Sequence, residues 1–160
     1  LSQSHIAYHF ISPVCFRYSI DEAFAILDGF TPEQLRQWGE SLHDRVLQSV
    51  GMPISIGIAP TKTLAKMASH FAKKYPGYNH CCIIDTEEKR RKALGIFDLA
   101  DVWGIGRRTF ETLNYYGITT PLDFADKSDS WARSHFSKPG YQTWLELNGH
   151  PCIDTAEILA

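Results

Sequence analysis

Two adjacent carboxylates, Asp21 and Glu22, lie inside an apolar run that extends from Val14 to Leu27. Unpaired acids are costly to bury, so acids in such a run usually have a charged partner or a metal ion. Neighbouring side chains on a regular strand point to opposite faces, so this pair can face one site only where the backbone bends. The run predicts either a metal site at a corner between two short strands or a solvated Asp-Glu turn that joins a hairpin.

Three lysines, Lys62, Lys66 and Lys73, share the polar side of a predicted helix over residues 62–74. The inward side of this helix consists of Leu64, Met67, Ala68 and Phe71. Lys62 and Lys66 fall near its N-terminus, where the helix dipole disfavours cations. Backbone N–H groups and two ammonium groups together would bind a phosphate chain well. The pattern predicts a phosphate site, with a pair of ordinary exposed lysines as the alternative.

A Gly-x-Gly turn, formed by Gly104, Ile105 and Gly106, precedes Arg107 and Arg108 at the start of a predicted helix. Such a turn between two helices exposes N–H groups at the second helix's start, which is a phosphate-binding arrangement. The pattern is typical of a helix-hairpin-helix, which grips a nucleic-acid backbone without reading bases.

Two histidines, His5 and His9, lie four residues apart in a segment whose loose apolar spacing predicts a helix over residues 1–12 that ends at Pro13. No third ligand accompanies them. We therefore interpret them as helix surface or packing residues and not as metal ligands.

The elements that position these residues alternate between strands and helices. The sequence predicts strands over 14–19, 23–27, 54–59 and 81–84, and helices over 32–50, 62–74 and 86–94. Thr31 and Gln34 form a capping box around Pro32, and Gly51 ends the first of these helices. Gly57 indicates a close backbone approach within its strand. The pattern predicts an α+β layer with helices on one face of a mostly antiparallel sheet.

After Gly95 no further strand is evident, and short helices are predicted over 107–116, 120–125, 130–136 and 139–147. We place a domain boundary there, which divides the chain into residues 1–94 and 95–160. Trp131, Phe136 and Trp144 are interpreted as the core of the helical part, with stacking platforms as the alternative.

Composition limits the class of protein. The 160 residues carry a formal net charge of −2 and contain four cysteines without CxxC spacing, which is typical of a protein of the reducing cytoplasm. No apolar run approaches the roughly 18 residues of a membrane span. Residues 60–110 carry ten basic and five acidic side chains, which indicates a local anion-binding surface or a solvated charged face. Because the chain begins at Leu1, we expect it to be a piece of a longer protein.

Three blocks, residues 18–24, 55–66 and 101–108, together resemble the Y-family (translesion) DNA polymerases, and the UmuC-type branch most closely. The resemblance implies that residues 1–94 are a partial palm domain and that residues 95–160 are a thumb domain with a helix-hairpin-helix. It also implies template-directed nucleotidyl transfer on primer-template DNA and deoxynucleoside triphosphates. Accessory SOS proteins and a sliding clamp are the further partners expected from it.

The resemblance assigns a role to each candidate residue. Asp21 would bind the catalytic Mg²⁺ ions, and Glu22 would complete the metal site. Lys66, with Lys62, would contact the incoming triphosphate, and residues 104–108 would hold the duplex backbone. Carboxylate oxygens suit such hard cations, and a pair of magnesium ions supports an in-line displacement.

Several parts of the resembled family are not expected in these 160 residues. A further metal-binding Asp, the small fingers and the residue that rejects ribonucleotides would lie upstream, and the little finger would lie downstream. We therefore expect the isolated chain not to polymerise DNA. The alternative is a non-catalytic module that binds the DNA backbone through its helix-hairpin-helix. A nuclease or glycosylase is less favoured, because no third acid or lysine nucleophile is placed for it.

Overall fold

The computed structural model describes residues 8–16 and 19–153, and of residues 11–16 and 19–24 it describes the backbone alone. The chain divides into two compact units, residues 1–85 and residues 86–160. Each unit is described by itself. No helix among the described residues is both long enough and apolar enough to cross a membrane.

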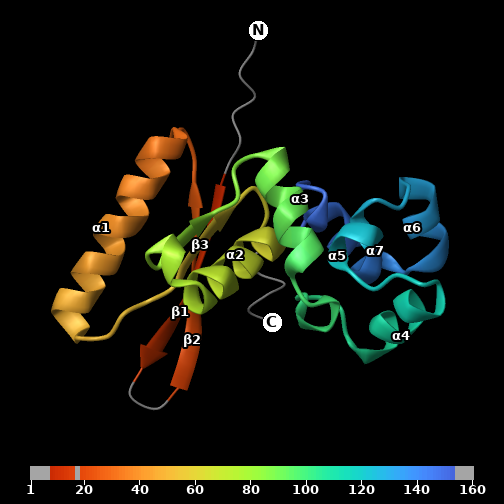
Figure 1. The fold of residues 1–160 in the computed structure, drawn as a ribbon, viewed down its shortest axis with the longest axis horizontal. Helices are drawn as coiled ribbons and strands as arrows, with labels where there is room; N and C mark the ends of the chain where they lie inside the picture. The colour runs from red at the N-terminus through yellow and green to blue at the C-terminus, as the bar shows by residue number, and fades with distance from the viewer. Residues whose placement is uncertain (1–7, 17–18, 154–160) are drawn as a thin grey trace, which may run out of the picture. The chain divides into compact units, whose positions relative to one another are not determined.

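The described part of the first unit contains a four-stranded sheet with the order β2-β1-β3-β4 (Figure 1). The strands are β1 (Tyr8–Phe16), β2 (Ser19–Leu27), β3 (Ile56–Ala59) and β4 (Cys81–Ile83). β1 runs antiparallel to both β2 and β3, whereas β3 and β4 are parallel. The order of strands and helices predicted for residues 14–94 is confirmed, and so is the α+β class.

The N-terminal segment differs from its prediction, because β1 replaces the helix expected up to residue 12. His9, Phe10 and Ile11 pair with β3, and Tyr8 and Phe10 are buried in the core. Pairing with two neighbouring strands and burial of Tyr8, His9 and Phe10 outweigh a loose helical spacing. β1 pairs with β3 only as far as Ile11, so at Pro13 it has one neighbouring strand, where a missing N–H is tolerated.

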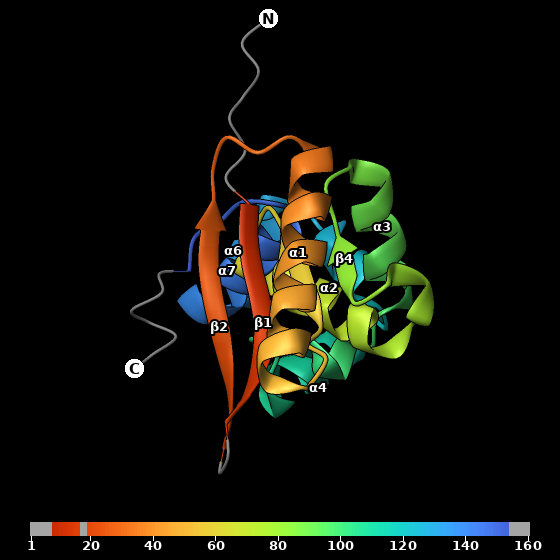
Figure 2. The ribbon, with the colours of Figure 1, turned by 90° about the vertical axis from the view of Figure 1, so that its left-hand side faces the viewer.

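The corner predicted at Asp21 and Glu22 is wrong. β2 continues through both residues, and its register with β1 is unbroken from Ser19 to Leu27. The hairpin ends at the pair Phe16 and Ser19, earlier in the chain than predicted. Figure 2 shows β1 and β2 side by side along this length.

Helix α1 (Pro32–Val50) begins and ends as the sequence predicts. The Thr31 N–H donates to Gln34 Oε1 at 2.9 Å, and the Gln34 N–H donates to Thr31 Oγ1 at 3.2 Å. Gly51 ends the helix in the left-handed region, with φ of 77°. The Trp38 ring meets Phe10 edge-on at 5.0 Å, so α1 covers one face of the sheet.

Helix α2 (Lys62–Lys74) covers the opposite face (Figure 1), which corrects the prediction that the helices share one face. On β3, Ile56 and Ile58 belong to the core under α1, whereas Gly57 faces α2. A Cβ atom on Gly57 would lie 2.0 Å from the Ala65 carbonyl oxygen and 2.3 Å from the Ser69 nitrogen. The predicted close approach is therefore confirmed, and it is an approach between β3 and α2.

The second unit is helical in its described part. Its helices are α3 (Glu87–Ile96), α4 (Arg107–Tyr115), α5 (Pro121–Ala125), α6 (Asp129–His135) and α7 (Lys138–Leu147), with a 3₁₀ turn, η2, over Leu99–Asp101. Fully buried side chains fill its centre: Leu94, Leu99, Leu113, Ile118, Phe124 and Leu147. Trp144 is buried as predicted, but Trp131 and Phe136 are only half-buried.

The division between the units falls between Asp85 and Thr86, nine residues before the predicted boundary. The cause lies in the contacts of α3. Arg90 Nη1 donates to the Leu147 carbonyl at 3.0 Å, and Arg91 forms a two-point ion pair with Asp126 at 2.9 and 3.1 Å. These bonds join α3 to the helices that follow it.

The close approach at Gly57 predicts a strong effect of a single methyl group. Gly57→Ala should lower the free energy of unfolding by about 2–3 kcal/mol, because backbone atoms of α2 would have to move. The matched control is Gly77→Ala, whose added Cβ meets nothing within 4 Å. Urea unfolding followed by circular dichroism checks both variants. Equal midpoints for the two would contradict the proximity of β3 and α2.

Candidate functional site

The acid pair lies in β2, close to the end of its hairpin with β1. Asp21 is opposite Val14 and Glu22 is opposite Pro13 in the backbone register. Adjacent side chains of a regular strand point to opposite faces, so the two acids share one site only if their side chains depart from that alternation. The side chains of both acids lie outside the described residues, so their joint orientation toward a metal remains a prediction. What the backbone provides is a continuous strand that carries both acids.

The three lysines predicted to share the polar side of α2 differ in exposure, and one of them is buried. Lys62 is only 4% exposed, Lys66 is half-buried and Lys73 is exposed. The physical reason is the depth of α2 on the sheet, since Thr61 and Thr63 on either side of Lys62 are buried too. Lys66 is therefore the lysine of the first turns that keeps part of its surface accessible.

The ammonium group of Lys62 influences a histidine on the sheet. Burial lowers the pKa of His9, and the nearby charge of Lys62 lowers it further. The His9 ring is therefore neutral at pH 7, and its Nδ1 has no hydrogen-bond partner among the described residues. His9 thus acts as a buried packing group on β1, which confirms the packing interpretation, although not in a helix.

The start of α2 matches a phosphate site only in part. No acid in its first turn neutralises the partial positive charge of the helix N-terminus, and Lys62 and Lys66 lie close to that end. However, Thr61 Oγ1 accepts a hydrogen bond from the Leu64 N–H at 3.2 Å, so a side-chain cap already uses one of the N–H groups. The lysines therefore carry more of the predicted anion affinity than the helix end does.

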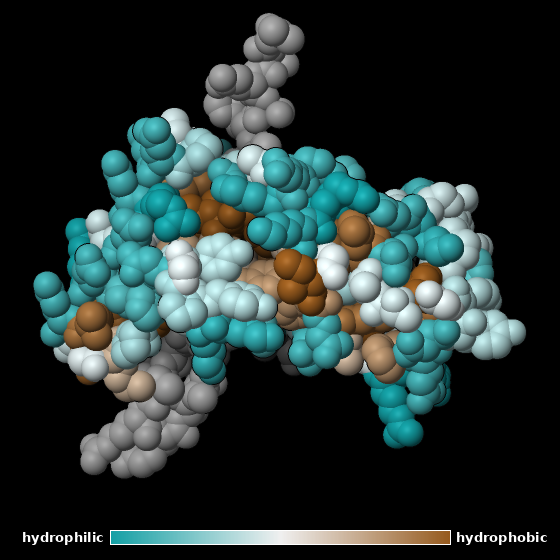
Figure 3. Space-filling model, viewed as in Figure 1, coloured by the Kyte–Doolittle hydropathy of each residue, from teal (hydrophilic) through white to brown (hydrophobic). Residues whose placement is uncertain are grey.

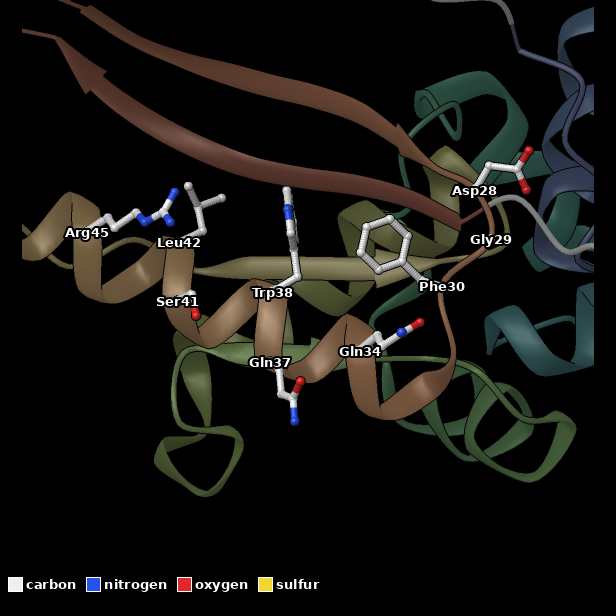
Figure 4. Close-up of a pocket in the computed structure, with 9 residues that line it drawn as sticks. All are labelled: Asp28, Gly29, Phe30, Gln34, Gln37, Trp38, Ser41, Leu42 and Arg45. Carbon is white, nitrogen blue, oxygen red and sulfur yellow. The ribbon is translucent and has the colours of Figure 1, made fainter.

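A cavity of about 530 Å³ opens on the α1 side of the sheet (Figure 4). Phe30, Trp38 and Leu42 form its apolar wall, and Asp28 and Arg45 lie at its ends. Because α2 covers the opposite face, the lysines do not line this cavity. It is separate from the predicted phosphate site.

The Gly-x-Gly turn has the shape that the sequence predicts. Gly104 has φ of +92°, and a Cβ atom there would lie 2.4 Å from Thr143 Oγ1 on α7. Ile105 is buried, which anchors the turn. Gly106 is the residue before α4, and an added Cβ there would meet nothing within 4 Å. The turn therefore packs against α7 at Gly104 and has open space at Gly106.

Helix α4 begins without a side-chain cap. The starts of α3, α5 and α6 are capped by Thr86, Thr120 and Ser128, whereas α4 and α7 have no such bond. Arg107 is 93% exposed in its side chain, and its Nε donates to Glu111 Oε1 at 3.2 Å; Arg108 is exposed as well. Two guanidinium groups therefore surround an uncapped helix start, which is suited to a phosphate.

Comparison with known proteins agrees with these features. A family model described as the impB/mucB/samB family matches residues 3–70, a range that includes the acid pair, Lys62 and Lys66. "Protein UmuC" and "Protein ImpB" of Salmonella typhimurium are each 38% identical to this chain, over 143 and 153 residues.

The similarity extends beyond residue 70 and includes a relative named as a DNA polymerase. "DNA polymerase IV 1" of Halalkalibacterium halodurans is 31% identical over 139 residues. The three matches cover 88%, 92% and 86% of this chain but 34%, 35% and 32% of the relatives. The chain thus spans about a third of the length of the curated impB/mucB/samB relatives and of the polymerase that it matches.

Solved structures have the same fold. An insertion ternary complex of Dbh DNA polymerase has a TM-score of 0.61 and 24% identity, with coverage of 83% of this chain and 39% of that one. DinB from Sulfolobus solfataricus has a TM-score of 0.57 and 25% identity, with coverage of 81% and 38%. The α+β fold class predicted from the sequence is therefore confirmed.

Sequence reasoning missed Thr143 as a neighbour of the turn. Its Oγ1 donates to the Pro139 carbonyl at 3.1 Å, which fixes its position on α7 behind Gly104. No local pattern marks Thr143, because its partner lies 39 residues earlier in the chain. Only the tertiary contact reveals that α7 supports the turn.

The two glycines of the turn should respond differently to the same substitution. Gly104→Ala should cost about 1–3 kcal/mol of stability, because its φ is positive and Thr143 occupies the space. Gly106→Ala should change stability by less than about 0.5 kcal/mol. Thermal unfolding checks both variants, and Thr143→Ala added to Gly104→Ala should restore part of the loss. An equal loss in both single variants would contradict the described turn.

Proposed function

We propose that this chain is part of the catalytic core of a translesion DNA polymerase of the UmuC type. The family match over residues 3–70 carries the proposal, because it includes both acids and both lysines of the predicted site. The named relatives support it, since they include UmuC and a DNA polymerase IV. In this proposal the first unit is part of a palm and the second unit is a thumb.

The acid pair would hold the magnesium ions. Carboxylate oxygens are the ligands that Mg²⁺ prefers, and the described residues contain no cluster of three or more metal-ligating side chains elsewhere. When bound, such ions activate the attacking primer hydroxyl and neutralise charge on the leaving pyrophosphate. The task of Asp21 and Glu22 is to bind these ions, and a strand is a rigid element on which to do so.

The lysines of α2 would bind the triphosphate of the incoming nucleotide. Lys66 is partly accessible and can donate to phosphate oxygens directly. Lys62 is buried, so its contribution would be a positive charge at the start of α2.

The second unit would hold the primer-template duplex. An uncapped helix start with two exposed arginines binds phosphate oxygens but reads no base. One of the similar solved structures is a polymerase ternary complex, which supports DNA and nucleotide as partners. Accessory SOS proteins, a sliding clamp and a cytoplasmic location complete the proposal, and these rest on the resemblance alone.

A second candidate function is a DNA-binding module without catalysis. The observation in its favour is that the start of α4 needs neither the acids nor a metal to bind a phosphate backbone. Metal binding separates the two candidates.

The catalytic proposal predicts that the acid pair binds divalent ions. Asp21→Asn and Glu22→Gln should each weaken Mn²⁺ binding by about tenfold or more, since a carboxylate ligand becomes neutral. Electron paramagnetic resonance of free Mn²⁺ measures this affinity. Asp28→Asn is the control, because Asp28 is an exposed acid just after β2. A wild-type affinity that both variants retain would favour the non-catalytic module.

Duplex binding should depend on salt and on the arginines of α4. Arg107→Ala and Arg108→Ala should each reduce the slope of log affinity against log salt by about 1 and weaken all DNA sequences alike. Lys92→Ala, an exposed cation on α3, should leave the slope unchanged. Fluorescence anisotropy with two unrelated duplexes measures these values. A sequence-dependent loss would contradict backbone binding at this helix start.

A further inference from the structure

Exposed aromatic side chains gather at the C-terminal end of α4, and the proposed function does not use them. Tyr115 is 82% exposed and Tyr116, directly after the helix, is 45% exposed. Tyrosine usually keeps at least one face of its ring covered in a folded protein. An aromatic ring as open as that of Tyr115 therefore requires an explanation.

The tyrosines rest on an ordered support. The Tyr116 ring meets Tyr115 at 5.0 Å, Trp131 at 5.6 Å and His135 at 4.7 Å, each nearly at a right angle. His135 stacks on Trp131 at 4.2 Å. We call Tyr115, Tyr116, Trp131 and His135 the aromatic ledge. Edge-to-face contacts of this kind hold the Tyr116 ring in place, and the Tyr115 ring packs against it.

Positive charge accompanies the aromatic ledge. Lys127 Nζ lies 5.3 Å from the centre of the Trp131 ring. Aromatic faces combined with cations are the two features that single-stranded nucleic acid requires, because bases stack and phosphates are anionic.

The aromatic ledge continues a face of α4 that begins at the Gly-x-Gly turn. Arg108, Thr112 and Tyr115 are spaced by four and three residues, which places them on one side of the helix. The Thr112 hydroxyl donates to the Arg108 carbonyl at 3.0 Å. Seven residues of helix span about 10 Å, so a strand bound at Arg108 could bring a nearby base to Tyr115.

The size of the patch favours a base over a protein partner. The aromatic ledge consists of four side chains, and the face of the molecule in Figure 3 is mostly hydrophilic. A stable protein interface buries on the order of 1,000 Å² or more in total, and its core is broad and apolar. A single base needs only one open ring face.

We propose that the aromatic ledge stacks an unpaired base of a strand whose backbone is bound at the start of α4. This proposal rests on the DNA-backbone binding proposed above and adds a preference for the junction between duplex and single strand. Tyr115 supplies the stacking face and contacts Tyr116, whose ring is held by Trp131 and His135.

The test compares a blunt duplex with the same duplex that carries a short single-stranded overhang, at either its 5′ or its 3′ end. The full chain should bind one overhang form about five- to hundredfold more tightly than the blunt duplex in fluorescence anisotropy. Tyr115→Ala should abolish this gain and leave blunt-duplex affinity unchanged. Tyr115→Phe, the matched control, should keep the gain, and an abasic overhang should lose it.

The outcomes separate the two proposals. Equal affinity of the wild-type chain for blunt and overhang duplexes would overturn the stacking role, while arginine-dependent duplex binding would still stand. Loss of the gain in Tyr115→Phe would also overturn stacking. Failure to bind any DNA would overturn both proposals. Because Tyr115 is so exposed, Tyr115→Ala should retain the wild-type circular dichroism spectrum.

Discussion

The contact between β3 and α2 at Gly57 is the constraint on which the first unit depends. A glycine there lets the backbone of α2 lie directly on the sheet, so nine of the thirteen residues of the helix are buried. The same depth buries Lys62 beside His9 and leaves Lys66 at the boundary with solvent. The absence of a side chain at Gly57 thereby determines how exposed the two lysines of the candidate nucleotide site are, because their exposure depends on the distance between α2 and the sheet.

The second unit uses a glycine in a related way. Gly104 accepts a left-handed backbone and leaves room for Thr143, so α7 can support the turn while Gly106 remains open. The result is a helix start with no side-chain cap, exposed arginines and, at the far end of the same helix, an open aromatic ring. Phosphate binding and base stacking are different interactions, and α4 presents groups for both.

Features that depend on residues a few positions apart agree with the predictions from the sequence. Features that depend on contacts between distant residues do not. The capping box of Thr31 and Gln34 and the end of α1 at Gly51 depend on residues a few positions apart, so the sequence predicts them well. The supposed helix before Pro13 became β1 because a distant strand, β3, pairs with it. Likewise, the place where the hairpin reverses depends on the register of two strands, which single-residue preferences do not determine.

The sequence by itself determined the residue types of the candidate site, their order along the chain and the similarity of residues 3–70 to the impB/mucB/samB family model. It also determined helix starts and stops, since capping is local chemistry. Only the tertiary structure decided that α1 and α2 cover opposite faces, that Lys62 is buried and that Tyr115 is open. Burial is a property of what packs against a residue, and that neighbour is usually far away in the sequence.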